Sequence, residues 1–138
     1  MIRRDKRSAI VVTSSVLGST PTAGSLTYSC TKTFADFLAR GLSYELDSKI
    51  DCLSWRAGFV QTNMVKKEAK GWVITPSVGV KGMLRDLGKE RFSRGVAVHD
   101  FCMGIIFNYI PWRVLCYFVF STAVKKHMEE LATTKKNE

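Results

Sequence analysis

The most restrictive feature of this sequence is a short apolar run that is followed by a glycine- and serine-rich segment and then by a helical repeat. Residues 8–13 (SAIVVT) are mostly apolar or β-branched and do not alternate with polar residues. This pattern is typical of a strand covered on both faces in a parallel sheet. Residues 16–27 are rich in Gly, Ser and Thr and include Pro21, so we predict a loop at the carboxyl end of that strand.

The following segments complete a strand–helix–strand unit. Helical periodicity runs from residue 28 to residue 46 and places four large apolar side chains on one face, namely Phe34, Phe37, Leu38 and Leu42. Residues 50–55 (IDCLSW) then resemble a second strand, which ends near Gly58, where glycine permits a turn. Consecutive strand, loop, helix and strand predict a βαβ unit and therefore an α/β fold.

Two further elements are predicted downstream. Residues 75–77 (TPS) are typical of a helix start, because proline is favoured in the first turn, and this helix should run to about residue 87, with Gly88 as its stop. Residues 94–98 (RGVAV) could supply a third, short strand.

Length, charge and cysteine spacing exclude several classes of protein. A chain of 138 residues supports one small domain, and its 46% hydrophobic content excludes a disordered protein. The net charge of +9 attracts phosphate groups in nucleic acid, anionic lipid or a cofactor. The basic residues are scattered and match no nucleic-acid-binding signature, so no nucleic-acid partner is expected. The four cysteines are far apart, without metal-ligand spacing, and no metal site is expected.

Residues 101–124 form a strongly apolar segment that is interrupted by Asn108, Pro111 and Arg113. A charged side chain near the middle of a spanning helix is unfavourable and proline favours a kink, so a single straight span is not expected. We predict a shallow or re-entrant membrane element, with Trp112 near the lipid headgroups. A buried core or dimer-interface helix is the alternative.

A possible catalytic group lies at the start of the helix at 28–46. Tyr28 and Lys32 are four residues apart and therefore share a helix face, where an ammonium can stabilise a phenolate and so promote proton transfer. Ser15 ends the first predicted strand, and the intervening loop could bring its hydroxyl to the same point. Tyr28 would then act as general acid on a carbonyl, and Ser15 would hold the carbonyl oxygen. Each residue alone also has an ordinary structural explanation, as a helix surface residue or a turn.

Three segments in this order and at this spacing resemble the second half of the short-chain dehydrogenase/reductase family. Residues 10–15 (IVVTSS) are similar to its serine strand, residues 28–32 (YSCTK) to its YxxxK helix, and residues 56–62 (RAGFVQT) to the turn that follows its next strand. The resemblance implies that Ser15, Tyr28 and Lys32 are catalytic.

The same resemblance implies that Tyr28, Lys32, Gly58, Val60 and Thr62 bind the cofactor, with Val60 and Thr62 at its nicotinamide end, and that NADP(H) is favoured over NAD(H). Ala57 departs from the family pattern, which usually has proline there. The implied fold is the C-terminal half of a Rossmann-like doubly wound parallel sheet, over residues 1–100, followed by a hydrophobic helical segment over residues 101–124 and a basic tail over residues 125–138.

The glycine-rich loop that holds a cofactor pyrophosphate in this family is not found in the sequence. We therefore expect the chain to correspond to the C-terminal part of a reductase and to be inactive by itself. Its first strand would present an unpaired edge, through which it could pair with another chain.

The later segments are most similar to the membrane-bound 3-ketoacyl-CoA reductase and 17β-hydroxysteroid dehydrogenase branch of the family. The expected function is therefore reduction of a 3-oxo group on a fatty acyl-CoA or of a steroid ketone. The final KKNE resembles a dilysine retrieval signal, which implies the cytosolic face of the endoplasmic reticulum membrane. A non-catalytic, membrane-associated interaction protein with the same half-fold is the alternative.

Overall fold

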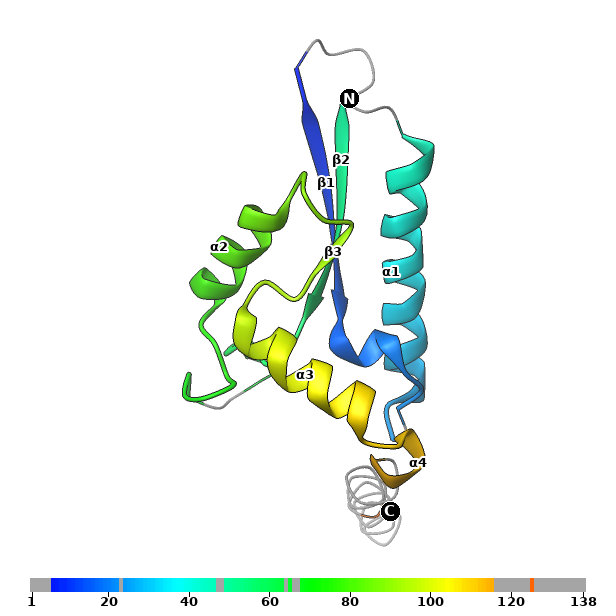
Figure 1. Ribbon diagram of the computed structural model, residues 1–138, viewed down its shortest axis with the longest axis vertical. Helices are drawn as coiled ribbons and strands as arrows, with labels where there is room; N and C mark the ends of the chain where they lie inside the picture. Colours follow the sequence, from blue (N-terminus) through cyan, green and yellow to red (C-terminus); the bar gives the residue numbers. More distant parts are fainter. Residues whose placement is uncertain are drawn as a thin grey trace, which may run out of the picture.

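The structure is a computed structural model, and it describes residues 6–22, 24–46, 49–63, 65, 68–115 and 125. In the described part, three strands form one sheet, with helices on both sides (Figure 1). The predicted α/β fold with a partial, doubly wound parallel sheet is confirmed.

The strands are β1 (Ser8–Ser15), β2 (Ile50–Ala57) and β3 (Phe92–Ser93), in the spatial order β1-β2-β3. Both pairs are parallel, and β1 is aligned with β2 from Ser8 opposite Ile50 to Ser15 opposite Ala57. This register places the carboxyl ends of the two long strands side by side. The loops that follow Ser15 and Ala57 therefore meet at one edge of the sheet.

Successive residues of β2 point to opposite faces of the sheet, as the pleat requires. Ser54 faces α1 (Leu26–Glu45), where its Oγ donates to Asp36 at 2.6 Å. Trp55 faces α2 (Pro76–Asp86), because its ring lies about as close as packing allows to Gly79 of that helix. Figure 1 shows the two helices on either side of the strands, which is the doubly wound arrangement.

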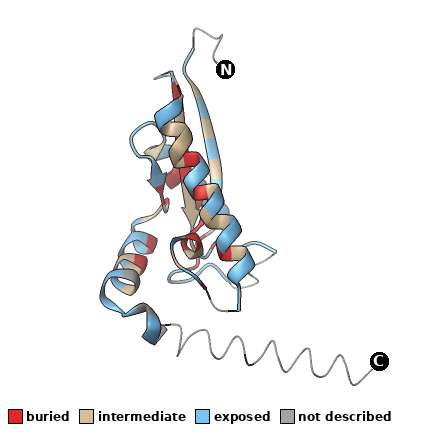
Figure 2. Ribbon diagram, turned by 90° about the vertical axis from the view of Figure 1, so that its right-hand side faces the viewer, coloured by how far each residue is buried: buried red, intermediate tan, exposed pale blue. Residues whose placement is uncertain are grey.

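The helix α1 packs in an unexpected orientation. The apolar side chains that define its predicted helical face are mostly outside, with Phe34 70% and Phe37 61% exposed. Its buried residues are instead Ser29, Asp36 and Ala39, and Figure 2 shows exposed residues over much of the helix. Helical periodicity therefore located the helix correctly but did not identify the side that contacts the sheet.

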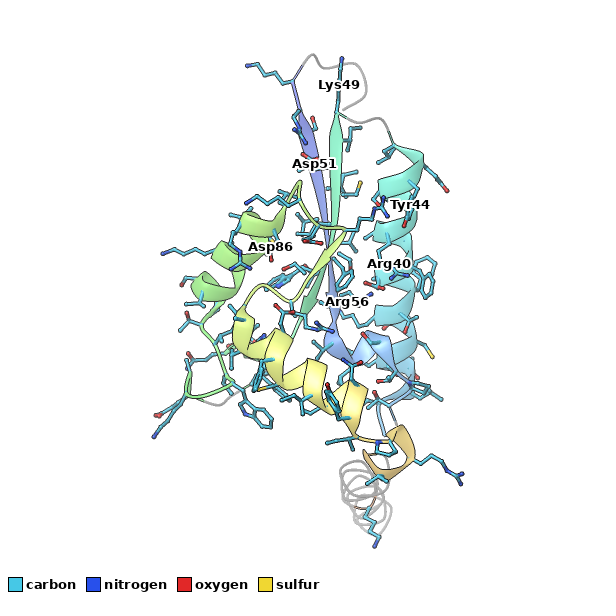
Figure 3. The ribbon with its side chains drawn as sticks, viewed as in Figure 1. Arg40, Tyr44, Lys49, Asp51, Arg56 and Asp86 are labelled. Atoms are coloured by element: carbon cyan, nitrogen blue, oxygen red, sulfur yellow. The ribbon has the colours of Figure 1, made fainter. Side chains whose placement is uncertain are left out.

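A cluster of charged side chains holds α1 against β2. The Asp36 carboxylate accepts hydrogen bonds from Arg56 at 2.7 and 2.9 Å, and Arg40 approaches it to 3.5 Å. Figure 3 shows Arg40 on this helix and Arg56 between the sheet and the helix. Burial alone would raise the pKa of Asp36, but the hydrogen bonds from Arg56 and Ser54 and the charges of both arginines outweigh burial and lower it.

The start of α2 is as predicted. Thr75 is the N-cap, its hydroxyl accepts from the Val78 amide, and Pro76 occupies the first turn. Gly88 follows the end of the helix with φ of +79°, a conformation that glycine adopts without steric cost. The predicted boundaries of this helix are therefore close to the observed ones.

The third strand lies slightly earlier than predicted. Pairing with β2 is confined to Phe92–Ser93, and Gly95 has φ of +83°, which is incompatible with an extended strand. The chain then enters α3 (Ala97–Tyr109), so the expectation of a strand over residues 94–98 was wrong.

The first part of the apolar segment forms two helices separated by Pro111. The helix α3 ends before Pro111, and α4 (Trp112–Leu115) follows it. Within the residues described, none of the helices has the length and apolar character needed to cross a bilayer. Residues 116–124 and the dilysine-like tail lie outside the described part of the chain.

Candidate active site

Ser15 occupies the carboxyl end of β1, where it is buried and extended. Its Oγ accepts a hydrogen bond from the Leu17 amide at 3.2 Å and so caps the short 3-10 helix η1 (Val16–Ser19). A hydroxyl can donate one hydrogen while it accepts, so the O–H of Ser15 remains able to donate to a second group. The cap thus fixes the oxygen without using its hydrogen.

Tyr28 and Lys32 lie on the same face of α1, as their spacing predicts. The Lys32 ammonium nitrogen is 5.7 Å from the centre of the Tyr28 ring, and it donates to the Thr13 carbonyl oxygen at 3.0 Å. The ammonium is therefore held between β1 and the tyrosine.

Three further contacts fasten α1 to the end of β1 beside these side chains. Ser14 Oγ donates to the Lys32 carbonyl and Thr33 Oγ1 donates to the Gly18 carbonyl, both at 2.7 Å. A Cβ on Gly18 would lie only 2.8 Å from the Lys32 carbonyl carbon, so glycine permits this close approach of two backbones. Sequence reasoning did not identify Ser14, Gly18 or Thr33, because nothing local in a loop glycine signals which helix it will contact.

A cavity of about 400 Å³ lies where these elements meet. Its wall includes Ser15, Tyr28 and Gly58, three of the residues that were predicted from the sequence. The other lining residues are mainly apolar and come from several segments, namely Val16, Leu17, Ser25, Phe59, Val65 and Met103. The volume falls in the range of about 300–1,000 Å³ that is typical of small-molecule sites. The cavity thus combines three hydroxyl-bearing residues, Ser15, Ser25 and Tyr28, with a largely apolar wall.

Lys32, Val60 and Thr62 do not line this cavity. Lys32 lies beside the lining residue Tyr28. Val60 is buried and forms a parallel bridge with Ile74, and the exposed Thr62 exchanges backbone and side-chain hydrogen bonds with Val65. The structure thus brings Ser15, Tyr28 and Gly58 to one cavity but not Lys32, Val60 and Thr62, and the roles assigned to all six residues stay predictions.

Two larger depressions of about 710 and 490 Å³ border the part of α1 that carries Phe37 and Arg40. Neither is lined by any of the six predicted site residues, and we therefore place the candidate site in the smaller cavity. The sequence patterns and the geometry agree on that location. In the part of the chain that the structure describes, no group of three or more His, Cys, Asp or Glu side chains could hold a metal ion.

The residues around the cavity fit the reactive end of a nicotinamide cofactor. A planar ring can lie against an apolar wall while the hydroxyls of Ser15 and Tyr28 remain available to a carbonyl group beside it. The fit covers only this end, because the GxxxGxG pattern that holds a pyrophosphate after a strand is not found in the sequence.

Comparison with a solved structure supports this fold assignment. A 7β-hydroxysteroid dehydrogenase superposes with a TM-score of 0.69 over 80% of this chain, at 16% sequence identity. The match covers 46% of that enzyme, so the present chain spans less than half of its length. A search of curated proteins by sequence gives no match.

Comparison with protein families assigns the chain more directly. Residues 1–71, just over half of the sequence, match the short chain dehydrogenase family. This region contains β1, α1 and β2 together with Ser15, Tyr28 and Lys32. The chain belongs to the short-chain dehydrogenase family.

Proposed function

We propose that this chain supplies the proton-donating and substrate-binding residues of an NAD(P)-dependent reductase. The observation that carries the proposal is the shared cavity, in which the Ser15 and Tyr28 side chains border one apolar space at the carboxyl ends of parallel strands. Ligands of open α/β sheets bind outside these strand ends. Membership of the short-chain dehydrogenase family supports the same assignment.

In the proposed reaction a substrate carbonyl binds with its oxygen toward Ser15 and Tyr28. The chemistry that a nicotinamide cofactor would supply there, when bound, is a hydride for the carbonyl carbon. Ser15 donates a hydrogen bond to the oxygen, and Tyr28 transfers its phenolic proton to it, which yields the alcohol. The Lys32 ammonium stabilises the phenolate that remains on Tyr28, and its bond to the Thr13 carbonyl holds it in place.

The proposed substrate is an apolar ketone, either a steroid ketone or the 3-oxo group of a fatty acyl-CoA. The wall formed by Val16, Phe59, Val65 and Met103 supports this class, because apolar walls favour hydrocarbon over polar substrates. The steroid option is further supported by the structural similarity to a hydroxysteroid dehydrogenase. NADP(H) is proposed ahead of NAD(H) on the family resemblance alone.

We also propose that the protein lies on a membrane surface, at the cytosolic face of the endoplasmic reticulum. An apolar stripe on α3 supports this, since Phe101, Ile105 and Tyr109 recur every four residues and are 71%, 42% and 80% exposed. Exposed Arg113 and Lys125 follow this helix and would favour anionic lipid. Sedimentation with anionic vesicles tests this proposal, and Phe101→Ser with Tyr109→Ser should reduce binding.

A non-catalytic interaction protein is the second candidate. Two features of β1 favour it. The side chains of Ala9, Val11 and Thr13 are exposed. In the described sheet β1 pairs only with β2 and therefore forms an edge strand. Such an edge can accept a strand from another chain. Titration with NADPH separates the candidates. The non-catalytic candidate is supported if the protein binds membranes or partners but does not bind NADPH, even when a nucleotide-binding half is supplied.

The decisive test of the reductase is Tyr28→Phe, which removes only the phenolic oxygen. NADPH oxidation is measured with a ketosteroid or a 3-oxoacyl-CoA, with the chain expressed together with the glycine-rich nucleotide-binding half of a reductase. We expect turnover to fall by about 10²- to 10⁴-fold, the usual contribution of a general acid, while NADPH binding is retained.

Tyr44→Phe is the matched control, because the same atom is removed from the same helix. Tyr44 lies toward the other end of α1, about 24 Å along the helix axis from Tyr28, where its hydroxyl accepts from Arg91 (Figure 3). This control should keep full turnover. Equal activities in the two variants would refute the role of Tyr28.

A further inference from the structure

The helix α3 has two distinct sides. The exposed stripe of Phe101, Ile105 and Tyr109 lies on one side, and His99 and Met103, one turn apart, are buried on another. His99 is completely buried and Met103 is 5% exposed. The buried pair therefore faces the rest of the protein, at the position where α3 closes the candidate cavity.

Met103 contributes the only side chain from α3 to the described wall of that cavity. It lies in this wall together with Gly58, Phe59 and Val65, while Ser15 and Tyr28 are supplied by β1 and α1. The reacting hydroxyls and Met103 therefore come from different elements. Methionine is long and unbranched, so its replacement changes the space in the cavity without altering a polar group.

His99 connects α3 to two other segments. Its Nε2 lies 2.8 Å from the Trp72 carbonyl oxygen, to which the neutral ring donates when Nε2 carries the hydrogen. Its ring also packs directly against Gly58, where a Cβ would lie 2.8 Å from both Cε1 and Nδ1. Among the residues described, Nδ1 has no hydrogen-bond partner. The ring thus acts as a spacer between Trp72 and the cavity residue Gly58.

We propose that α3 determines which ketones enter the cavity, with Met103 as the specificity-determining residue and His99 as a positioning residue. The proposal rests on the proposed function for the chemical class of the ligand. Met103 limits the volume available to the bulky apolar part of the ketone. His99 acts through Gly58 and fixes the distance between α3 and the segment that follows β2.

The test of Met103 compares a small ketone, cyclohexanone, with a four-ring ketone, androstenedione. Binding of both to the full chain is measured by NMR titration, which needs no cofactor and no turnover. The quantity compared is the affinity for androstenedione divided by the affinity for cyclohexanone. Met103→Ala enlarges the cavity and should raise this affinity ratio by about tenfold, because adding or removing a few carbon atoms in an apolar pocket changes affinity by about this factor. Met103→Trp should shift the ratio in the opposite direction.

Met83→Ala is the matched control, because Met83 is also buried but belongs to α2. It should leave the ratio unchanged. An unchanged ratio in both Met103 variants overturns the inference and leaves the reductase proposal intact. Absence of ketone binding by the unsubstituted chain overturns both.

The test of His99 uses two variants with different hydrogen-bonding capacity. His99→Gln keeps an N–H donor for the Trp72 carbonyl, whereas His99→Leu fills the space with no donor. The glutamine variant should keep the wild-type affinity ratio, and the leucine variant should change it several-fold. If the leucine variant keeps the ratio while only its melting temperature falls, His99 is structural and the positioning role is wrong.

Discussion

Replacing Asp36 with asparagine should destabilise the protein strongly, because this carboxylate is the anionic centre of the contact between α1 and β2. Asp36 is 4% exposed, and it accepts from Ser54 and twice from Arg56 at distances between 2.6 and 2.9 Å. An amide in its place keeps one acceptor oxygen but turns an NH₂ group toward the guanidinium. Arg56 would then be a largely buried cation without a counter-charge.

The expected cost is about 3 kcal/mol. Removal of one partner from a buried ion pair typically costs about 3–5 kcal/mol. The lower end applies here, because the Arg56 side chain is 13% exposed and lies 4.0 Å from the centre of the Phe92 ring, a cation–π contact that persists in the variant. The free energy of unfolding falls by about 1–3 kcal/mol per M of urea, so a loss of about 3 kcal/mol should lower the urea concentration at the unfolding midpoint by about 1–3 M.

Urea unfolding, followed by circular dichroism at low micromolar concentration, measures this change. Asp100→Asn is the matched control, because it makes the same substitution in the exposed pair with Arg94, where Asp100 is 52% exposed. Exposed pairs contribute about 0–1 kcal/mol, so the control should unfold near the wild-type midpoint. Equal midpoints for the two variants would show that the Asp36 cluster does not hold α1 on the sheet.

Three further results are expected from the same unfolding assay. Stability should decline as the pH falls from about 4 through the lowered folded-state pKa of Asp36, because the unfolded chain takes up the proton first, and Asp36→Asn should weaken this dependence. Gly82→Ala should destabilise the protein by about 1–3 kcal/mol or more, because the added Cβ would overlap the Gly95 carbonyl oxygen. Gly41→Ala should instead stabilise α1 by about 0.5–1 kcal/mol, because the added Cβ meets nothing within 4 Å. Thr75→Ala should cost about 1 kcal/mol through loss of the α2 cap, and a smaller midpoint change than in the Gly82 variant is expected.

The sequence predicted the elements around the candidate site well, because their signals are local. The unalternating β-branched run located β1 correctly, but the expectation that both faces of this strand are covered was wrong, because Ala9, Val11 and Thr13 are exposed on one face. The spacing of Tyr28 and Lys32 determines a shared helix face. Thr75 and Pro76 likewise marked the start of α2 from two adjacent residues. These features depend on neighbours within one helical turn, which a single sequence contains.

The remaining features depend on tertiary contacts and could not be predicted in this way. The orientation of α1 is decided by Asp36 reaching Arg56, twenty residues away, and not by the positions of Phe34 and Phe37. Met103 reaches the cavity from a segment whose apolar composition suggested membrane contact first, with a buried core or dimer-interface helix as the alternative. His99 carried no signal, because a lone histidine becomes informative only when its neighbours are known.

The contacts between α1 and the end of β1 have a consequence for how such a protein can change during evolution. Backbone groups of Lys32 and Gly18 accept hydrogen bonds from side chains across this junction, so the segments that carry Ser15 and Tyr28 are fastened to each other. Adaptation to a new molecule by moving either hydroxyl would break several of these bonds at once. Met103, which a separate helix contributes to the wall, can be altered independently, which would let one chemistry be retained while the compounds it acts on diversify.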